Sequence, residues 1–214
     1  LSKNSKISTI RRRLVSIGMV HKLKGHYLDT KHPIIVENLM GIKRVKGSIQ
    51  KGKKPILINH LKLIINVINE QKIEKIKKYR DKSIILIGFG GGFRRTELTS
   101  IDYEDLEFVP EGLKITVKRS KTDQFGEGMI KGLPYFTNEK YCPVYNLKKW
   151  LEISKIRSGS IFRRFSKGSS LTDKRLTDQS VVLLMKEYLN LAGIDNKNFA
   201  GHSLRSGFAT VAAE

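Results

Sequence analysis

The chain has 214 residues with 41 Lys and Arg against 20 Asp and Glu, and its formal net charge of +21 indicates a polyanion as the partner. No apolar run approaches membrane-spanning length and no N-terminal segment has the order of a signal peptide, so we expect a cytoplasmic protein without a membrane partner. Cys142 is the only cysteine, and the five histidines show no H-E-x-x-H pattern, which argues against an intrachain disulfide or a metal site.

The first 54 residues are the most basic part of the chain, with 14 Lys and Arg against 2 acidic residues. Apolar residues recur there at positions 7, 10, 14 and 17, and this spacing predicts an amphipathic helix. Its polar face carries three consecutive arginines, Arg11, Arg12 and Arg13. A second helix should follow, with Pro33 in its first turn and Thr30 as its cap.

A linker is predicted at residues 46–54, which are rich in lysine and glycine and end before a proline. We place the domain boundary in it, with a small helical domain at 1–52 and a larger domain at 53–214. The larger domain should begin with a helix capped by Asn59, followed by a helix from about Asp81 through SIILIGF.

From residue 105 the apolar period changes toward two, in DLEFV, LKITV and MIKGL, with a turn at Glu111 and Gly112. This pattern predicts a short antiparallel sheet. Helices return at about 144–154, 177–192 and from 202 to the end. Helices, then a small sheet, then helices indicate a mostly helical α+β fold.

Two glycine-containing segments suggest a nucleotide site and both fail the test. A G-x-G-x-x-G motif starting at Gly88 would need glycine where Phe93 stands. The segment GSIQKGKK matches a P-loop except at its last position, where Lys54 replaces Ser or Thr and Pro55 opposes the helix that must follow. We therefore expect no nucleotide and no other cofactor.

Three segments carry charged residues that suit phosphate chemistry: GGFRRTEL at 91–98, KRSKTDQFGEG at 118–128 and GHSLRSGFAT at 201–210. Arg94 and Glu97 are three positions apart on an expected helix, so the carboxylate can hold the guanidinium while another face meets an anion. Lys121 falls in an expected hairpin turn, and His202 and Arg205 share the start of the last helix. Each feature alone is more typical of a solvated surface.

Together, the three segments resemble the signature of the tyrosine recombinases, the phage integrase family, in order, spacing and flanking sequence. FRRTELTSIDYEDL is similar to the family's first arginine box, RSKTDQ to its β-hairpin lysine segment and GHSLRSGFAT to its H-x-x-R box. TIRRRLVSIGMVH and GIKR resemble the second half of the family's helical, SAM-like core-binding domain. The resemblance extends over residues 7–214, and it implies a partial core-binding domain followed by a catalytic domain with a small antiparallel sheet.

The activity that the resemblance implies is metal-free phosphoryl transfer on double-stranded DNA, through a 3′-phosphotyrosyl link and a freed 5′-hydroxyl. Arg94 and Arg205 match the two arginines that hold the non-bridging oxygens of the scissile phosphate. Lys121 matches the general acid for the leaving 5′-oxygen, and His202 matches a histidine that assists proton transfer. We assign Glu97 to orienting Arg94. The family also implies self-association on DNA, as a tetramer.

Further basic residues are expected to contact DNA: Arg11, Arg12, Arg13, Lys43, Arg44 and Arg119. Arg95 leaves the register of the first arginine ambiguous, and we choose Arg94 because it directly follows the Gly-Phe pair. Cys142 should pack as a small apolar group.

The chain departs from the family at its end, because the nucleophilic tyrosine should lie well beyond Arg205 and residue 214 is the last. All seven tyrosines precede His202, and the nearest, Tyr188, has the helical spacing of a core residue. We therefore expect either a piece of a recombinase, incomplete at its C-terminal end, or a remnant, which binds DNA without cutting it.

Two other functions remain open. One is a DNA-binding module without catalysis, such as a decoy integrase or a regulator on the same scaffold. The other is a basic RNA-binding or ribosome-associated protein, which the net charge alone would permit. Plain binding would not need four such residues drawn together from three segments, which argues against the second: Arg94, Lys121, His202 and Arg205.

Overall fold

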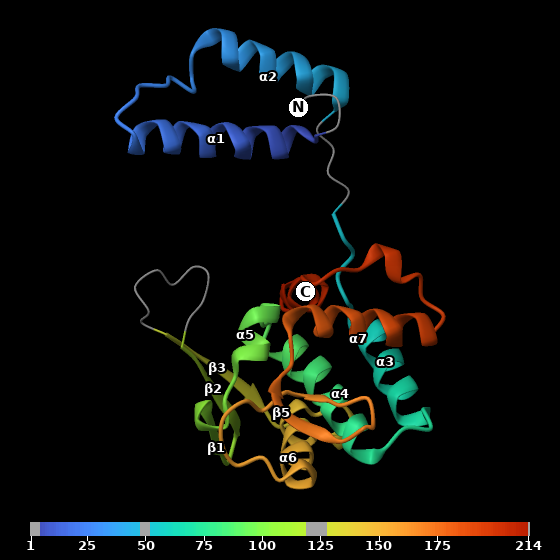
Figure 1. The fold of residues 1–214 in the computed structure, drawn as a ribbon. Helices are drawn as coiled ribbons and strands as arrows, with labels where there is room; N and C mark the ends of the chain where they lie inside the picture. The colour runs from blue at the N-terminus through green and yellow to red at the C-terminus, as the bar shows by residue number, and fades with distance from the viewer. Residues whose placement is uncertain (1–4, 48–51, 119–127, 214) are drawn as a thin grey trace. The chain divides into compact units, whose positions relative to one another are not determined.

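The computed structural model describes residues 5–47, 52–118 and 128–213, and the chain divides into two compact units, Leu1–Gly52 and Lys53–Glu214. Figure 1 shows a pair of helices in the first unit and a larger α+β arrangement in the second. Among the described residues, no helix combines the length and the apolar character that crossing a membrane requires.

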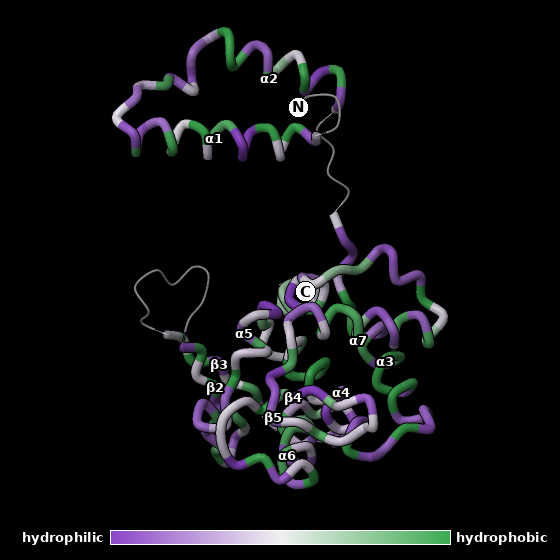
Figure 2. Tube along the Cα trace, viewed as in Figure 1, coloured by the Kyte–Doolittle hydropathy of each residue, from purple (hydrophilic) through white to green (hydrophobic). Residues whose placement is uncertain are grey.

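The first unit consists of α1 (Ile7–Leu23) and α2 (Pro33–Lys46), which contact each other. In Figure 2 hydrophobic and hydrophilic residues alternate along both helices, as an amphipathic pattern requires. Only Ile7 is buried in α1, and none of the described residues of α2 is. The three consecutive arginines of α1 are exposed, as the sequence predicted.

Histidines, and not the predicted residues, cap two of the helices. At the start of α2 the ring Nδ1 of His32 accepts a hydrogen bond from the N–H of Ile34 at 3.3 Å, so the prediction of Thr30 as the cap was wrong. In α3 (Ile58–Glu70), Nδ1 of His60 accepts from the N–H of Leu57 at 3.2 Å, and Asn59 lies inside the helix. An imidazole nitrogen thus satisfies an amide that a helix start would otherwise leave unpaired.

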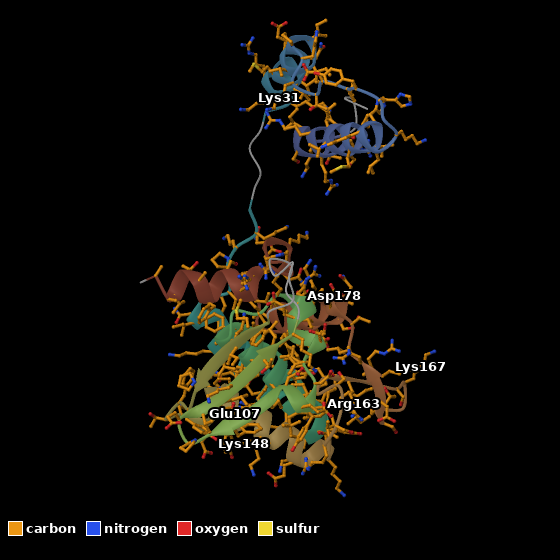
Figure 3. All side chains as sticks on the ribbon, turned by 90° about the vertical axis from the view of Figure 1, so that its left-hand side faces the viewer. Lys31, Glu107, Lys148, Arg163, Lys167 and Asp178 are labelled. Atoms are coloured by element: carbon orange, nitrogen blue, oxygen red, sulfur yellow. The ribbon has the colours of Figure 1, made fainter. Side chains whose placement is uncertain are left out.

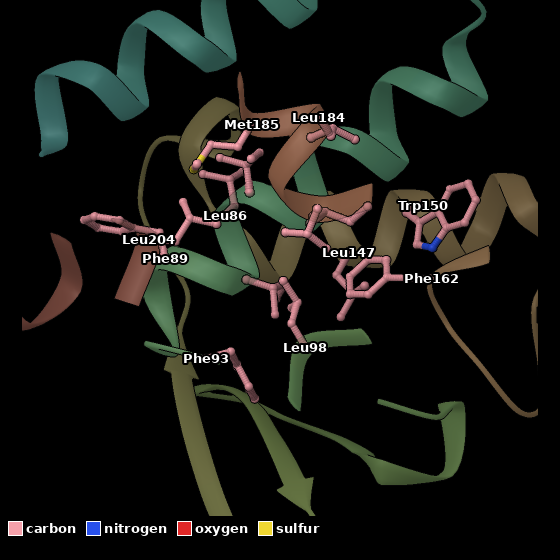
Figure 4. Close-up of a cluster of buried hydrophobic side chains, with 14 of the residues drawn as sticks. Leu86, Phe89, Phe93, Leu98, Leu147, Trp150, Phe162, Leu184, Met185 and Leu204 are labelled. Carbon is pink, nitrogen blue, oxygen red and sulfur yellow. The ribbon is translucent and has the colours of Figure 1, made fainter. Parts of the chain in front are cut away.

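The centre of the second unit is α4 (Lys75–Gly90), which begins six residues before the predicted start at Asp81. Every residue of Arg80–Phe89 is buried, as expected for a helix that is covered on all sides. Figure 4 shows Leu86 and Phe89 of this helix among the side chains of the core. The other helices and turns that complete the unit are α5 (Arg95–Ser100), α6 (Pro143–Ser154), α7 (Asp178–Leu191), α8 (Ser203–Val211) and the 3-10 turns Tyr103–Asp105, Glu139–Tyr141 and Asn196–Asn198.

The predicted antiparallel sheet is present, with strands β1 (Leu106–Val109), β2 (Gly112–Val117) and β3 (Met129–Pro134) in the order β1-β2-β3. Leu113, Ile115 and Val117 form the buried row of β2. Directly opposite Ile115 on β3 stands Lys131, and opposed residues of an antiparallel pair share one face of the sheet. A lysine therefore faces the core side of this sheet.

A second, two-stranded sheet was not predicted. It pairs β4 (Arg163–Phe165) with β5 (Leu171–Arg175) in antiparallel register. The side chain of Arg163, labelled in Figure 3, donates to the carbonyls of Ser158 and Ser160 and to the carboxylate of Asp173, so it serves local structure.

The segment that enters the second unit is tied directly to the region of α8. The N–H of Ile56 donates to the carbonyl of Ser203 at 2.9 Å, and the N–H of Lys54 donates to the carbonyl of Asn198 at 2.7 Å. Gly207 of α8 lies so close that a Cβ there would stand 1.9 Å from the carbonyl oxygen of Ile56. This close backbone approach holds the last helix against the domain.

Candidate phosphate-binding site

The chain between α4 and α5 reverses through a glycine turn, Gly91–Phe93. Gly92 has φ +54, a left-handed conformation that side chains rarely adopt, and a Cβ at this residue would stand 2.7 Å from the ring of Phe208. The turn ends at Arg94, the N-cap residue of α5. Glycine is therefore required where the carbonyls of Gly91 and Gly92 meet the cations described below.

Glu97, on the first turn of α5, accepts two hydrogen bonds from Arg94. Its Oε2 accepts from the backbone N–H at 2.9 Å, and its Oε1 accepts from the guanidinium NH1 at 2.5 Å. The Glu97 side chain is only 3% exposed. One carboxylate thus caps the helix and fixes the guanidinium of Arg94, which is the contact expected from their spacing.

Two further cations reach the same place from other elements. Arg205 on α8 donates from NH1 to the carbonyl of Gly92 at 2.8 Å, and this nitrogen lies 3.9 Å from Oε2 of Glu97. Lys131 on β3 donates from Nζ to the carbonyls of Gly91 and Gly92, at 2.8 and 3.2 Å, and Nζ lies 3.8 Å from the same Oε2. We call Arg94, Glu97, Lys131 and Arg205 the Glu97 cluster.

Burial and the contacts within the Glu97 cluster shift the pKa values of Glu97 and Lys131. Burial alone would raise the pKa of Glu97, but the hydrogen bonds from Arg94 and the charge of Lys131 outweigh it and lower that pKa. Burial lowers the pKa of Lys131, and the charges of Arg205 and Arg94 add to this effect, while Glu97 opposes it. The carboxylate therefore stays ionised at neutral pH.

The cluster has more positive than negative charge. Three cations and one carboxylate give its four side chains a net charge of +2, and the Arg205 side chain is 40% exposed. Guanidinium groups are planar, forked donors that suit phosphate and carboxylate oxygens. The arrangement can therefore bind an anion at its exposed side.

The model of the phage integrase family matches residues 57–214. This chain belongs to that family. It is 42% identical over 217 residues to an integrase/recombinase XerD homolog of Selenomonas ruminantium, a match that covers 100% of this chain and 63% of the relative. The chain thus spans less than two thirds of the length of that relative.

Solved structures of tyrosine recombinases share the fold of this integrase-family chain. The XerH recombinase bound to its difH substrate matches with a TM-score of 0.59 and 19% identity, covering 98% of this chain and 60% of that one. A lambda integrase tetramer bound to a Holliday junction matches with a TM-score of 0.52 and 15% identity, covering 99% and 60%. At these identities the likeness concerns the fold, and it confirms the predicted α+β class.

The structure brings together some of the predicted site residues. Arg94, Glu97 and Arg205 belong to one cluster, and His202 is exposed directly before α8, three residues before Arg205. Lys121, the predicted general acid, and Arg119 lie outside the described residues. The catalytic roles themselves stay predictions.

Arg95, which directly follows Arg94, pairs with a carboxylate of another helix. Arg95 lies 3.7 Å from the carboxylate of Asp178, which Figure 3 labels and which begins α7. A Cβ on Gly201 would meet the Arg95 side chain, so this arginine packs between α5 and the segment before α8. Arg95 is thus directed to Asp178, and the choice of Arg94 as the catalytic arginine stays a prediction.

Lys131 is the site residue that the sequence reasoning missed. Its signal was nevertheless readable, because Lys131 alternates with the apolar Leu133 on β3 and therefore belongs to the row that faces the core. A lysine in such a row is expected to have a specific partner.

Residues of the first unit that were expected to contact DNA are all exposed: Arg11, Arg12, Arg13, Lys43 and Arg44.

Within residues 5–47, 52–118 and 128–213, no three His, Cys, Asp or Glu side chains lie together as a metal site requires.

Cys142 is buried and caps α6, where Sγ accepts from the N–H of Tyr145 at 3.4 Å. Its burial agrees with the prediction of a small apolar group, but Sγ also accepts hydrogen bonds from the N–H groups of Phe136 and Tyr145, so Cys142 is a helix cap as well.

Proposed function

We propose that the protein is a site-specific DNA recombinase and that the Glu97 cluster holds the scissile phosphate of duplex DNA. The observation that carries the proposal is that Arg94 and Arg205, from separate segments, converge on one buried carboxylate and one glycine turn. A surface that only attracted DNA would need charge alone, whereas this arrangement fixes two forked donors relative to each other.

In the proposed reaction the two arginines stabilise the negative charge that gathers on the phosphate at the transition state. A tyrosine oxygen forms a bond to phosphorus while the bond from phosphorus to the 5′-oxygen breaks. Lys121 gives its proton to the leaving 5′-oxygen, and His202 assists the transfer of the proton that the attacking tyrosine hydroxyl loses. Glu97 holds Arg94 in place and takes no proton.

The attack itself is assigned to no residue of this chain. Residues 206–214 contain no tyrosine, and the resemblance implies a tyrosine that follows Arg205. Tyr188 is 3% exposed and donates its hydroxyl hydrogen to Asp81, and burial together with that carboxylate raises its pKa. Tyr188 is therefore unsuited to attack a phosphate.

The first unit is proposed to contribute DNA contacts of its own, as part of a core-binding domain. Its exposed arginines on α1 and the exposed Lys43 and Arg44 on α2 suit phosphate contacts. Self-association on DNA and action in the cytoplasm belong to the same proposal. The XerH and lambda integrase structures, bound to DNA, are the source of the analogy.

The proposal is tested by duplex DNA binding measured over a range of salt concentrations. Affinity of the native chain should fall steeply with salt, because phosphate contacts release counterions. Arg205→Ala should weaken binding by about tenfold, the loss of one charge-assisted contact. The matched control is Arg164→Ala, which removes the same charge from an exposed position on β4 and should change affinity by less than about twofold.

Two results would contradict the proposal: affinity that does not depend on salt, or equal effects of the two variants. A second readout is a nicked suicide duplex, on which the 214-residue chain should bind without forming a covalent adduct. A phosphotyrosyl adduct from these 214 residues would make one of the seven tyrosines the nucleophile and would show that the site is assigned wrongly.

A further inference from the structure

The geometry points to Lys131 as a positioning residue that keeps Arg205 available for phosphate by sharing Glu97 and the glycine turn with it. This inference rests on the proposed function of the Glu97 cluster. It concerns a lysine on the core face of the sheet, which lies outside the three charged segments at 91–98, 118–128 and 201–210.

The position of Lys131 needs a physical explanation. Its side chain is 13% exposed and stands across from the buried Ile115, where an apolar residue would pack without loss of hydration. Removing an ammonium group from water is unfavourable unless hydrogen bonds and an opposite charge replace the water. Lys131 has both, and its Nζ also lies 4.3 Å from the centre of the Phe93 ring.

The donors of Lys131 are directed inward. An ammonium group has three N–H donors, and the carbonyls of Gly91 and Gly92 accept from Nζ, which also lies 3.8 Å from Glu97. These partners belong to the turn and to the helix that carry Arg94. Lys131 is thus suited to hold the site together, and not to deliver a proton.

Lys131 and Arg205 share two partners. The carbonyl of Gly92 accepts from both side chains, and Oε2 of Glu97 lies within 4 Å of both. If the charge of Lys131 were absent, the buried carboxylate would attract Arg205 more strongly and draw its exposed guanidinium inward. Lys131 therefore balances Glu97 and leaves Arg205 directed toward a ligand.

The same lysine anchors β3, the strand that begins eight residues after Lys121 in the sequence. Its hydrogen bonds join β3 to the glycine turn, and thereby to the arginine site. Lys131 therefore fixes β3 relative to the turn and the helix that carry Arg94.

The test compares variants of the 214-residue chain in titrations with inorganic phosphate, followed through the side-chain NMR signals of the arginines. Lys131→Met keeps the length of the stem but removes the charge, and we expect about tenfold weaker phosphate binding and a shifted Arg205 signal. Lys131→Arg restores the charge and should bind within about threefold of the native chain. Lys114→Met, on the neighbouring strand, removes an exposed lysine and should change binding by less than about twofold.

The readouts separate positioning from a purely structural role. If Lys131→Met lowered only the melting temperature while its folded form bound phosphate like the native chain, the inference would be wrong. Should that variant fail to fold, Lys131→Arg and Lys131→Gln decide: equal phosphate affinity in both would also contradict the inference. If the native chain binds DNA as proposed but Lys131→Met does too, this inference fails and the proposed function stands. If Arg205→Ala has no effect on DNA binding, the proposed function itself fails.

Discussion

Asp81 and Glu97 are two buried carboxylates of the second unit that pair with arginine. Their surroundings differ in net charge and in the exposure of the arginines. Asp81 is held by Arg80, with Nε donating to Oδ1 at 2.8 Å, and by the hydroxyl of Tyr188 at 2.7 Å from Oδ2. We call these three residues the Asp81 cluster. Both of its charged side chains are buried, and its net charge is zero. The Glu97 cluster instead combines one buried carboxylate with three cations, of which Arg205 is partly exposed.

The difference shows how the same residue types serve stability in one place and binding in another. In the Asp81 cluster every charge is compensated inside the protein, and the Arg80 guanidinium also packs over the ring of Phe165, at 4.6 Å from its centre. In the Glu97 cluster the excess of positive charge is left for a ligand. Each cluster holds a group with a shifted pKa, so the charge balance and the exposure are what separate the two roles.

The largest expected effect is on the free energy of unfolding, when the Asp81 cluster is changed. Asp81→Asn leaves Arg80 buried without an opposite charge, which should lower the free energy of unfolding by about 3 kcal/mol. Arg205→Ala should lower it by less than about 1 kcal/mol, because that side chain is partly exposed. Urea denaturation measures both, and DNA binding under native conditions should show the reverse order. Equal stability losses would remove the distinction between the clusters.

The pH dependence of stability should separate the clusters at opposite ends of the scale. The folded pKa of Glu97 is lowered, so its contribution is present above the unfolded value of about 4 and is lost as the pH falls through the folded value. The folded pKa of Tyr188 is raised, mainly by burial and by Asp81, so its contribution is present below about 10 and is lost as the pH rises above it.

Unfolding free energies measured from pH 2 to pH 11 check this expectation. Glu97→Gln should reduce the loss of stability on the acid side only, and Tyr188→Phe should reduce the loss on the alkaline side only. If Glu97→Gln left the acid limb unchanged, the carboxylate would not be held ionised by Arg94 and Lys131 in the way that their contacts indicate.

The smallest expected effect is that of replacing Arg95, the residue that left the register of the first arginine ambiguous in the sequence. Arg95→Ala removes only a partly exposed pair with Asp178 at 3.7 Å, which should change stability by less than about 1 kcal/mol. DNA affinity should fall much less than in Arg94→Ala, because Arg94 alone of the two is bonded to Glu97. A larger loss of DNA affinity in Arg95→Ala would reverse the assignment of the first arginine.

Part of the Glu97 cluster could be predicted from the sequence, because the contact between Arg94 and Glu97 follows from their spacing. Arg94 and Glu97 meet through one helical turn, and Arg205 follows from the H-x-x-R segment. No motif contains Lys131, and although its alternation with Leu133 indicates the face of β3 that meets the core, its partners become known only from the fold. That face is set by the pairing of Lys131 with Ile115, a contact between strands.

Other misses have similar causes. The strands β4 and β5 have the sequences RRF and LTDKR, which are short and polar and show no apolar alternation. The first turns of α4 are rich in lysine, so the apolar pattern begins only after the helix does. His32 caps α2 through Nδ1, although histidine is not among the residues preferred at the N-cap. His60 is the third residue of α3, and its Nδ1 accepts from the N–H of the N-cap residue Leu57.

A structure of the chain bound to duplex DNA would show whether the Glu97 cluster holds a backbone phosphate. We predict that one backbone phosphate accepts hydrogen bonds from the guanidinium groups of both Arg94 and Arg205, while Lys131 stays on the carbonyls of Gly91 and Gly92. A complex in which the DNA backbone passes over other basic residues, with neither arginine on a phosphate, would contradict the account.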